Sequence, residues 1–325
     1  MNPPISLQNP FTFSPLLQQP SGLEQNGEII FPFKNGAYRL VKDDNYTQNF
    51  GYQWNKFTET QIDREQKNMQ LSYNRFFAAT GWDKENLAGK SILEVGSGAG
   101  RFSQIVLDHT KANLYSVDYS NAVEANFKNN GRHQERFNLY QASVYDMPFA
   151  KGQFDKVFCF GVIQHTPDVE KSVKCLIDMV KPGGELVVDF YPIKGWWTKI
   201  HAKYIFRPIT KKWSNEKLLN KIEKNIDWLI KTSRFFSKIG IGKLTNRFLP
   251  ICDISGTIPK GLSYEKLREI CVLDTFDMFG PEFDQPQKIV TVVDWFNKYG
   301  MNKVWGGEIR YNNCVASVVK GKKPI

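Results

Sequence analysis

Three glycines at alternate positions follow a short apolar run, in the segment ILEVGSGAGRF at residues 92–102. Because glycine carries no side chain, Gly96, Gly98 and Gly100 would let the backbone approach a bound ligand closely. Glu94 lies near the end of the apolar run. A dinucleotide fingerprint needs its third glycine at position 101, where this chain has Arg101, so the spacing disfavours NAD. A structural tight turn is the alternative interpretation of the loop taken alone.

A second apolar run ends in the segment SVDYS at residues 116–120, and its acid, Asp118, follows Gly96 by 22 positions. An acid at the end of a second strand can accept hydrogen bonds from both hydroxyls of a ribose. Asp118 could also cap the helix that begins near Ser120, and the two roles are compatible. The neighbouring Tyr119 could lie against an adenine ring or simply pack against other side chains.

The elements that must position these residues alternate between strands and helices. Strands are predicted at 91–95, 113–117, 137–141, 156–160 and 185–190, and helices at 100–108, 122–129 and 169–180. After an interruption, a helix at 289–299 and two closing strands at 302–305 and 312–320 complete the pattern. This rhythm is typical of a parallel sheet. We therefore predict an α/β fold with a doubly wound, mostly parallel seven-stranded sheet, whose core comprises residues 90–190 and 286–325.

The segment before this core divides into two parts. Residues 1–22 are rich in proline and glutamine and have little periodic apolar pattern, so we expect a disordered leader. Residues 23–89 are predicted to hold a small β element and a helix that precedes the core. The β element is a hairpin at 23–42, because Asn35-Gly36 stands between two β-prone runs. The helix is expected at 60–79.

The interruption at residues 191–285 is basic and is predicted to be helical. Thirteen Lys or Arg stand against three acids between positions 195 and 250, so this segment accounts for the whole net charge of +10. A helix is expected after the N-cap Ser214, with an apolar face comprising Leu218, Leu219, Ile222, Ile226, Leu229 and Ile230. We favour a lid over the acceptor for this region. An anionic membrane surface contacted through 195–250, where Trp196, Trp197 and Trp213 lie, is the alternative.

These motifs resemble those of the class I S-adenosylmethionine-dependent methyltransferases, over residues 90–190 and 289–320. LEVGSGAG at 93–100 is similar to the family's first motif, and Asp118 is similar to its ribose-binding acid. FDKVFCFGVIQHTPD at 154–168 resembles the family's FDxVxxxxVLHHxxD segment, with Gln164 in place of the first histidine. The resemblance implies a Rossmann-like fold, with the helical insertion before the last two strands, and S-adenosylmethionine as the cofactor.

The resemblance also assigns residues outside the first motif. Many relatives have an acid where Ala142 stands, so the adenine contact must come from the backbone of Ser143 and Val144 or be lost. The flank FGYQWNKF at 50–57 resembles that of a bacterial subgroup of small-molecule methyltransferases. In that subgroup a small zinc ribbon often precedes the flank. Residues 23–42 contain no cysteine, so we predict that no metal is bound.

The predicted cofactor-binding residues are Glu94, Gly96, Ser97, Gly98, Gly100, Asp118, Tyr119, Ser143, Val144, Gly161, Trp54 and Arg75. Trp54 and Arg75 would close the pocket, Arg75 by pairing with the carboxylate of the methionine moiety, although an aromatic helix packed on the sheet would look the same. Methyl transfer is an in-line displacement, so the protein mainly has to align the reactants and exclude water. His165 is the candidate base for a hydroxyl or ammonium acceptor, because open α/β sheets bind ligands at the carboxyl ends of their strands. A structural histidine is the alternative.

We expect methyl transfer to a small-molecule, nucleotide-linked or lipid-linked acceptor. The alternatives are a catalytically silent binding or scaffold protein of the same fold, and a methyltransferase that acts on RNA or protein. No RNA-binding module is visible, so no nucleic-acid partner is expected. The first 20 residues lack the charged start and apolar middle of a secretory signal, so we expect a cytoplasmic location. The oligomeric state has no sequence signal.

Overall fold

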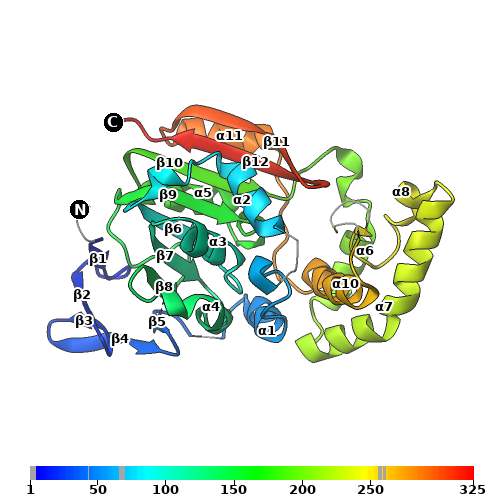
Figure 1. Ribbon diagram of the computed structural model, residues 1–325, viewed down its shortest axis with the longest axis horizontal. Helices are drawn as coiled ribbons and strands as arrows, with labels where there is room; N and C mark the ends of the chain where they lie inside the picture. Colours follow the sequence, from blue (N-terminus) through cyan, green and yellow to red (C-terminus); the bar gives the residue numbers. More distant parts are fainter. Residues whose placement is uncertain (1–4, 43, 66–69, 255–257, 259–260) are drawn as a thin grey trace. The chain divides into compact units, whose positions relative to one another are not determined.

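The computed structural model describes residues 5–42, 44–65, 70–254, 258 and 261–325. The chain divides into two compact units (Figure 1). The first comprises Met1–Pro192, Phe283–Ile309 and Ala316–Ile325, and the second comprises Ile193–Glu282 and Arg310–Val315. Within the described ranges, no helix combines the length and the apolar character that are needed to cross a membrane.

The first unit is built on one mixed sheet. Over the part of the chain that the structure describes, its twelve strands lie in the order β1-β2-β3-β4-β5-β8-β7-β6-β9-β10-β12-β11. The bounds are β1 Leu7–Gln8, β2 Pro15–Gln19, β3 Gly22–Gln25, β4 Glu28–Lys34, β5 Ala37–Arg39, β6 Ser91–Val95, β7 Asn113–Asp118, β8 Phe137–Gln141, β9 Phe154–Phe160, β10 Val180–Phe190, β11 Asn302–Tyr311 and β12 Cys314–Lys322. Strands β5, β8, β7, β6, β9 and β10 run parallel, and β12 is antiparallel to β10. The α/β class is confirmed. The seven-stranded prediction is incomplete, because β1–β5 extend the sheet.

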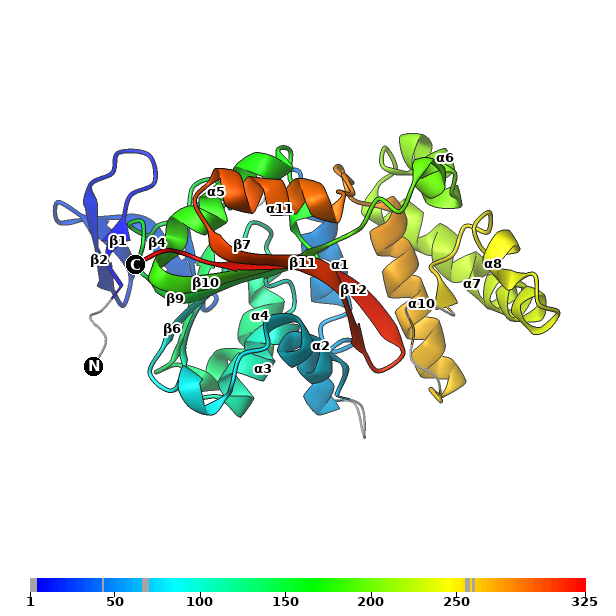
Figure 2. The same cartoon turned by 90° about the horizontal axis from the view of Figure 1, so that it is seen from above.

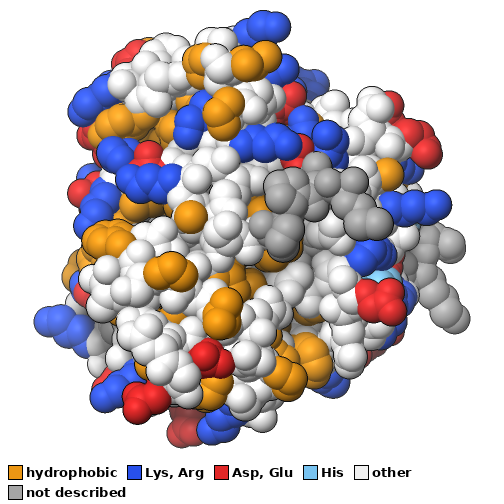
Figure 3. All heavy atoms as spheres, turned by 90° about the vertical axis from the view of Figure 1, so that its left-hand side faces the viewer, with side chains coloured by type: hydrophobic (Ala, Val, Ile, Leu, Met, Phe, Trp, Pro, Cys, Tyr) orange, Lys and Arg blue, Asp and Glu red, His pale blue; other side chains and the backbone are white. Residues whose placement is uncertain are grey.

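The N-terminal strands correct the expectation of a disordered leader at residues 1–22. Of that segment, residues 5–22 are described and include β1 and β2. Leu16 and Leu23 are buried in the same hydrophobic cluster as Phe149, which follows β8. Figure 3 shows the side of the molecule on which these strands lie, with apolar side chains scattered among charged ones. The segment is ordered by contacts with residues far along the chain, which local composition does not reveal.

The hairpin predicted within residues 23–42 is confirmed. Phe33 pairs with Tyr38 and Lys34 with Ala37, so Asn35-Gly36 forms a two-residue turn between β4 and β5. Asn35 has a φ of 49° and Gly36 a φ of 80°. A two-residue hairpin turn of this kind favours Asn-Gly because both central residues adopt positive φ.

Helices cover both faces of the sheet in the first unit. They are α1 Gln48–Lys56, α2 Leu71–Thr80, α3 Arg101–His109, α4 Val123–Asn130, α5 Val169–Met179 and α11 Ile289–Lys298, with short 3-10 turns η1 Asp63–Glu65, η2 Glu85–Leu87, η3 Gly131–His133 and η4 Ile163–His165. In Figure 2, α5 and α11 lie on one face of the sheet and α2, α3 and α4 on the other. The helix predicted at 60–79 begins only at Leu71, and residues 66–69 of that segment lie outside the described residues.

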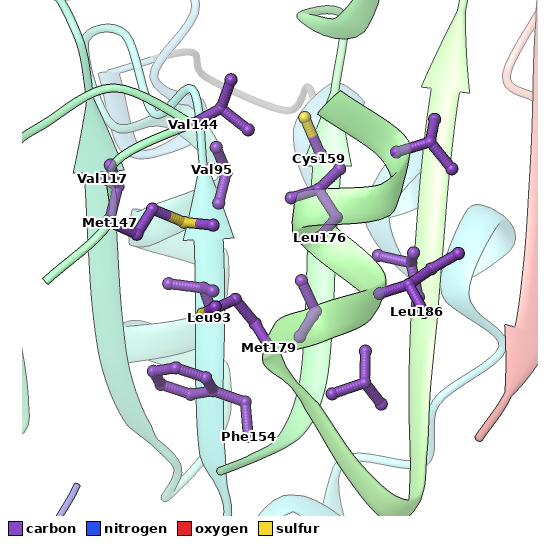
Figure 4. Packing of buried hydrophobic residues seen from close by; sticks show 14 of the residues in the cluster. Leu93, Val95, Val117, Val144, Met147, Phe154, Cys159, Leu176, Met179 and Leu186 are labelled. Atoms are coloured by element: carbon purple, nitrogen blue, oxygen red, sulfur yellow. The ribbon is translucent and has the colours of Figure 1, made fainter. Parts of the chain in front are cut away.

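The two faces of the sheet bury alternate strand residues in two hydrophobic clusters. Leu93 and Leu186 belong to the cluster that contains Leu176 of α5, as Figure 4 shows. Their strand neighbours Ile92 and Val187 belong to the other cluster, together with residues of α2 and α3. A parallel sheet that is covered on both faces needs apolar residues at consecutive positions, which explains the runs recognised in the sequence.

The second unit is helical, with η5 Trp196–Lys199, α6 Ala202–Thr210, α7 Asn215–Lys238, α8 Gly242–Thr245 and α10 Tyr264–Phe279. The side chain of Ser214 accepts a hydrogen bond from the backbone N–H of Lys217 at 3.3 Å, as predicted for an N-cap. All six residues of the predicted apolar face of α7 are buried. Arg268 of α10 donates to the carboxylate of Asp227 on α7 at 3.2 Å. The helical insertion and its apolar face are therefore confirmed.

We predict that Leu186→Ala destabilises the first unit by about 2–5 kcal/mol, because truncating a core leucine removes buried surface and leaves a cavity. Leu186 is 0% exposed, whereas Leu17 in β2 is 60% exposed. Leu17→Ala is the matched control and should change stability by no more than about 0.5 kcal/mol. Urea unfolding of both variants measures the difference. Equal midpoints for the two variants would contradict the assignment of Leu186 to the core.

Candidate functional site

The glycine loop between β6 and α3 is held against the end of β7. The N–H of Gly96 donates to the carbonyl oxygen of Val117 at 2.7 Å, and the N–H of Gly98 donates to the carboxylate of Asp118 at 2.8 Å. Gly98 has a φ of 52°, and a Cβ added there would lie 3.0 Å from the indole nitrogen of Trp54. Glycine is required at this position because the backbone conformation is unfavourable for other residues and because α1 approaches closely.

Asp118 links the two loops that follow β6 and β7. Its Oδ1 accepts hydrogen bonds from the N–H of Ser120 at 2.8 Å and from its hydroxyl at 2.6 Å, while Oδ2 accepts from Gly98. Burial raises the pKa of Asp118, and the hydrogen bonds from Ser120 and Gly98 lower it. A carboxylate offers about four acceptor positions. Three are in use, so the structural role and a hydrogen bond to one ribose hydroxyl are compatible in this arrangement.

Buried polar atoms around the loop fit a polar ligand. Ser97 Oγ, Gln53 Oε1 and Asn49 Nδ2 are buried and have no hydrogen-bond partner within the described residues. Gln53 and Asn49 lie one turn apart on α1, the helix that carries Trp54. Buried polar groups in proteins are nearly always hydrogen-bonded, and a polar ligand would supply partners for these atoms. A nucleoside joined to an amino acid, as in S-adenosylmethionine, offers both kinds of group.

Glu94 lies beneath the glycine loop in a buried hydrogen-bond network. Its Oε2 accepts hydrogen bonds from the hydroxyls of Ser103 on α3 and of Ser116 on β7, the latter at 2.8 Å. Asn126 of α4 donates to the Ser103 hydroxyl at 2.9 Å. Burial raises the pKa of Glu94 from 4.5 to about 7, although the two serine hydrogen bonds lower it. In this arrangement Glu94 links β6 to α3 and β7, the elements on either side of the glycine loop and next to it.

A second carboxylate, Asp189 near the end of β10, joins two predicted site residues. It accepts a hydrogen bond from the N–H of Gly161 at 2.5 Å, and Arg75 of α2 donates to it through Nε at 3.0 Å and Nη2 at 2.6 Å. Asp189 is buried. Sequence reasoning missed this residue, although an acid inside a Val- and Leu-rich strand is an available signal. The predicted role of Arg75 toward the methionine carboxylate stays a prediction, because part of its guanidinium pairs with Asp189.

The loop after β8 lies beside Asp118, as expected for an adenine contact. The N–H of Ala142 donates to the carbonyl oxygen of Asp118 at 3.0 Å. Ser143 and Val144 follow directly and are buried. On the other side of Asp118, the ring of Tyr119 lies 5.1 Å from the ring of Tyr46, which adds an aromatic pair that the sequence did not reveal. These residues border the same strand ends, while their contacts with a cofactor stay predictions.

His165 lies in η4 after β9, between aromatic rings. The ring of Phe50 on α1 is 5.1 Å away and the ring of Tyr191 is 5.5 Å away. Its Nδ1 lies 2.9 Å from the carbonyl oxygen of Phe283, which can only accept, so Nδ1 carries a hydrogen. The adjacent Gln164 is 0% exposed, and neither atom of its amide has a hydrogen-bond partner within the described residues. The sequence drew attention to Gln164 only because it replaces the first histidine of the FDxVxxxxVLHHxxD pattern.

The absence of a bound metal stays a prediction. No group of three or more His, Cys, Asp or Glu is arranged to hold a metal ion among the residues that the structure describes. All five cysteines are free thiols, and four of them are buried.

Comparisons with known proteins identify the domain around this site. Residues 93–188 match the methyltransferase domain family. Phosphoethanolamine N-methyltransferase 2 of Caenorhabditis elegans is 27% identical over 52% of this chain and 41% of that protein. The ubiquinone biosynthesis O-methyltransferase of Coxiella burnetii is 30% identical over 38% of this chain and 55% of that protein. The chain thus spans about half the length of these curated relatives.

A solved structure from Burkholderia thailandensis is also similar. It is a 1,6-didemethyltoxoflavin-N1-methyltransferase with S-adenosylhomocysteine bound, with a TM-score of 0.46 and 11% identity over 88% of this chain and 92% of that chain. The segment 93–188 contains the glycine loop, Asp118 and the β9 motif, so the predicted methyltransferase domain and its cofactor, S-adenosylmethionine, are confirmed. The flank at 50–57 lies outside that segment, and the bacterial subgroup stays a prediction.

We predict that Asp118→Ala weakens S-adenosylmethionine binding tenfold or more in calorimetry. A hydrogen bond to a charged group contributes about 1.5–3 kcal/mol, and about 1.4 kcal/mol corresponds to a tenfold change in affinity. The variant also releases Gly98 from Oδ2. Asp294→Ala, at an exposed position of α11, is the control and should bind like the wild type. Unchanged affinity in folded Asp118→Ala would exclude a binding role for this carboxylate.

We predict that Glu94 makes the stability of the ligand-free protein decrease as the pH rises from about 4.5 to about 7. A raised pKa means that the folded chain holds the proton more tightly than the unfolded chain, so Glu94 contributes most below pH 4.5 and loses that contribution through about pH 7. Glu94→Gln should remove this slope, which corresponds to about 3 kcal/mol. Urea unfolding at several pH values tests it, with the exposed Glu85→Gln as control. Parallel pH profiles for wild type and Glu94→Gln would contradict the prediction.

Proposed function

We propose that this chain transfers the methyl group of S-adenosylmethionine to a hydroxyl or amine of a small-molecule acceptor. The observation that carries the proposal is the 2.8 Å hydrogen bond from Gly98 to Asp118, which builds the cofactor edge inside the segment that matches a methyltransferase domain. The intact loop and acid argue against a catalytically silent scaffold, although Ala142 and Gln164 depart from the pattern of relatives.

Different residues around the glycine loop would bind different parts of the cofactor. When bound, S-adenosylmethionine supplies a methyl group on a positively charged sulfur, and the sulfur keeps the bonding electron pair when the methyl leaves. Asp118 would bind a ribose hydroxyl, and the backbone of Ser143 and Val144 would bind the adenine. Trp54, which lies against Gly98, would cover the loop and exclude water.

His165 is suited to accept the proton that the acceptor loses. Because Nδ1 donates to the carbonyl oxygen of Phe283, the basic atom of the neutral ring is Nε2. The hydrogen bond and the rings of Phe50 and Tyr191 fix the orientation of the imidazole. A positioned base of this kind contributes about 10²–10⁴-fold to a proton transfer. His165 would therefore raise the rate for a hydroxyl or ammonium acceptor.

Gln164 supports a polar acceptor. Its amide can donate two hydrogen bonds and accept two, and both polar atoms are buried without a partner among the residues that the structure describes. Leaving such groups unpaired costs about 1–3 kcal/mol, so an acceptor that pairs with them gains affinity over an apolar one. We assign Gln164 to acceptor recognition, next to the base at the end of β9.

The relatives are named for different acceptors, so we infer the acceptor class from the residues of the site and not from the relatives. They include enzymes named for phosphoethanolamine, for ubiquinone biosynthesis and for tRNA U34. A nucleotide-linked or lipid-linked small molecule also fits the proposal. An RNA acceptor is the second candidate, favoured by the net charge of +10, although the basic residues concentrate at 195–250, outside the methyltransferase domain.

The proposal predicts transfer of labelled methyl from S-adenosylmethionine to a component of a fractionated metabolite extract. His165→Gln should lower this transfer about 10²–10⁴-fold and abolish the acidic limb of the pH profile, where protonation of the base lowers the rate, with cofactor affinity unchanged in calorimetry. His109→Gln, at an exposed position of α3, is the matched control and should keep full activity.

Each other outcome changes the assignment. Label that appears only in RNA or protein would replace the small-molecule acceptor. Cofactor binding without transfer to any fraction would favour the silent scaffold. Full activity in His165→Gln would show that the histidine is structural and that the acceptor needs no base at this position.

A further inference from the structure

We infer that the second unit docks on an anionic membrane surface through η5, α6 and the segment 241–248. The inference concerns residues outside the methyltransferase domain and does not depend on the identity of the acceptor. The main observation behind it is which side chains of α6 are buried and which are exposed, and the positive charge of the region is a second observation.

Helix α6 exposes its apolar residues and buries its arginine. Ile205 and Ile209, one turn apart, are 54% and 59% exposed, and Pro208 between them is also exposed. Arg207 is buried and donates to the carbonyl oxygen of Pro281 at 2.7 Å. A helix on a protein core normally places apolar residues inside and charged residues outside. The outward face of α6 is therefore suited to a surface that takes up apolar side chains.

Neighbouring segments extend this face. Arg247 donates to the carbonyl oxygens of Trp197 and Ile200, and the N–H of Ala202 donates to the carbonyl oxygen of Arg247 at 2.9 Å. These bonds hold the end of segment 241–248 against η5 and the start of α6. Further exposed apolar residues of these segments are Trp196, Trp197, Ile200, Phe206, Ile241, Leu244 and Phe248. We call this set, with Ile205 and Ile209, the α6 surface.

Positive charge on the same segments favours an anionic membrane as the partner. Lys199 and Lys212 are exposed and flank the apolar residues of α6 in the sequence, and the surrounding region carries the whole net charge of the protein. Tryptophan prefers the boundary between lipid and water, and each basic residue near an anionic membrane contributes about 1 kcal/mol. Apolar side chains that insert among headgroups, with lysines at their rim, are typical of peripheral attachment to anionic lipids.

The test measures co-sedimentation of the full chain with vesicles. The wild type should bind vesicles of phosphatidylcholine mixed with phosphatidylserine at low salt, and pure phosphatidylcholine vesicles at least tenfold more weakly. Ile205→Glu with Ile209→Glu should reduce binding to the anionic vesicles at least tenfold, and so should Lys199→Glu with Lys212→Glu. Val290→Glu, at an exposed apolar position of α11 in the first unit, is the matched control and should bind like the wild type.

Three results would overturn the inference. They are no binding of the wild type to anionic vesicles, equal binding to both vesicle types, and unchanged binding of the Ile205→Glu, Ile209→Glu variant with its circular dichroism intact. Light scattering in the same buffers identifies the rival occupant: a concentration-dependent dimer that this variant abolishes, without vesicle binding, would assign the α6 surface to a second copy of the chain. Methyl transfer measured without vesicles tests the proposed function separately.

Discussion

Burial of a parallel sheet on both faces is the constraint on which the rest of the structure depends. The parallel strands β5, β8, β7, β6, β9 and β10 end at one edge, and helices cover their two faces. Burying polar side chains inside the two hydrophobic clusters costs free energy. Polar and reactive side chains are therefore placed at the carboxyl edge of the sheet, where ligands bind in folds of this kind. Asp118 is the last residue of β7, and the glycine loop, Ser143 and His165 follow the carboxyl ends of β6, β8 and β9.

Two carboxylates organise that edge in the same way. Asp118 accepts the N–H of Gly98 after β6, and Asp189 accepts the N–H of Gly161 after β9. Each acid lies at or near the end of the strand next to the turn that it holds, and each glycine has a positive φ. Charged acceptors form stronger hydrogen bonds than neutral ones, so the turns are preorganised before a ligand binds. Glu94 adds a third buried carboxylate beneath the loop, at the cost of a raised pKa.

The two units follow opposite rules of burial. In the first unit the apolar strand residues are buried in two clusters. Its buried polar atoms without a hydrogen-bond partner among the described residues include those of Ser97 and Gln164, which follow β6 and β9. In the second unit α7 buries its apolar face, whereas α6 exposes Ile205 and Ile209. Unpaired polar atoms indicate a small polar ligand, and unburied apolar residues indicate a larger apolar surface. The two features therefore support the proposals that catalysis belongs to the first unit and membrane attachment to the second.

The sequence by itself determined the local elements and the loop chemistry, because glycine spacing, capping residues and apolar runs act over a few positions. The existence of strands β6–β12, the Asn35-Gly36 turn and the buried face of α7 follow from such signals. Only the tertiary structure decided that residues 5–25 extend the sheet, that Asp189 pairs with Arg75, and that α6 exposes Ile205 and Ile209. These features depend on partners that are distant in the chain. An amphipathic segment has the same sequence whether its apolar side is buried or exposed, so its burial is set by the surface that it meets.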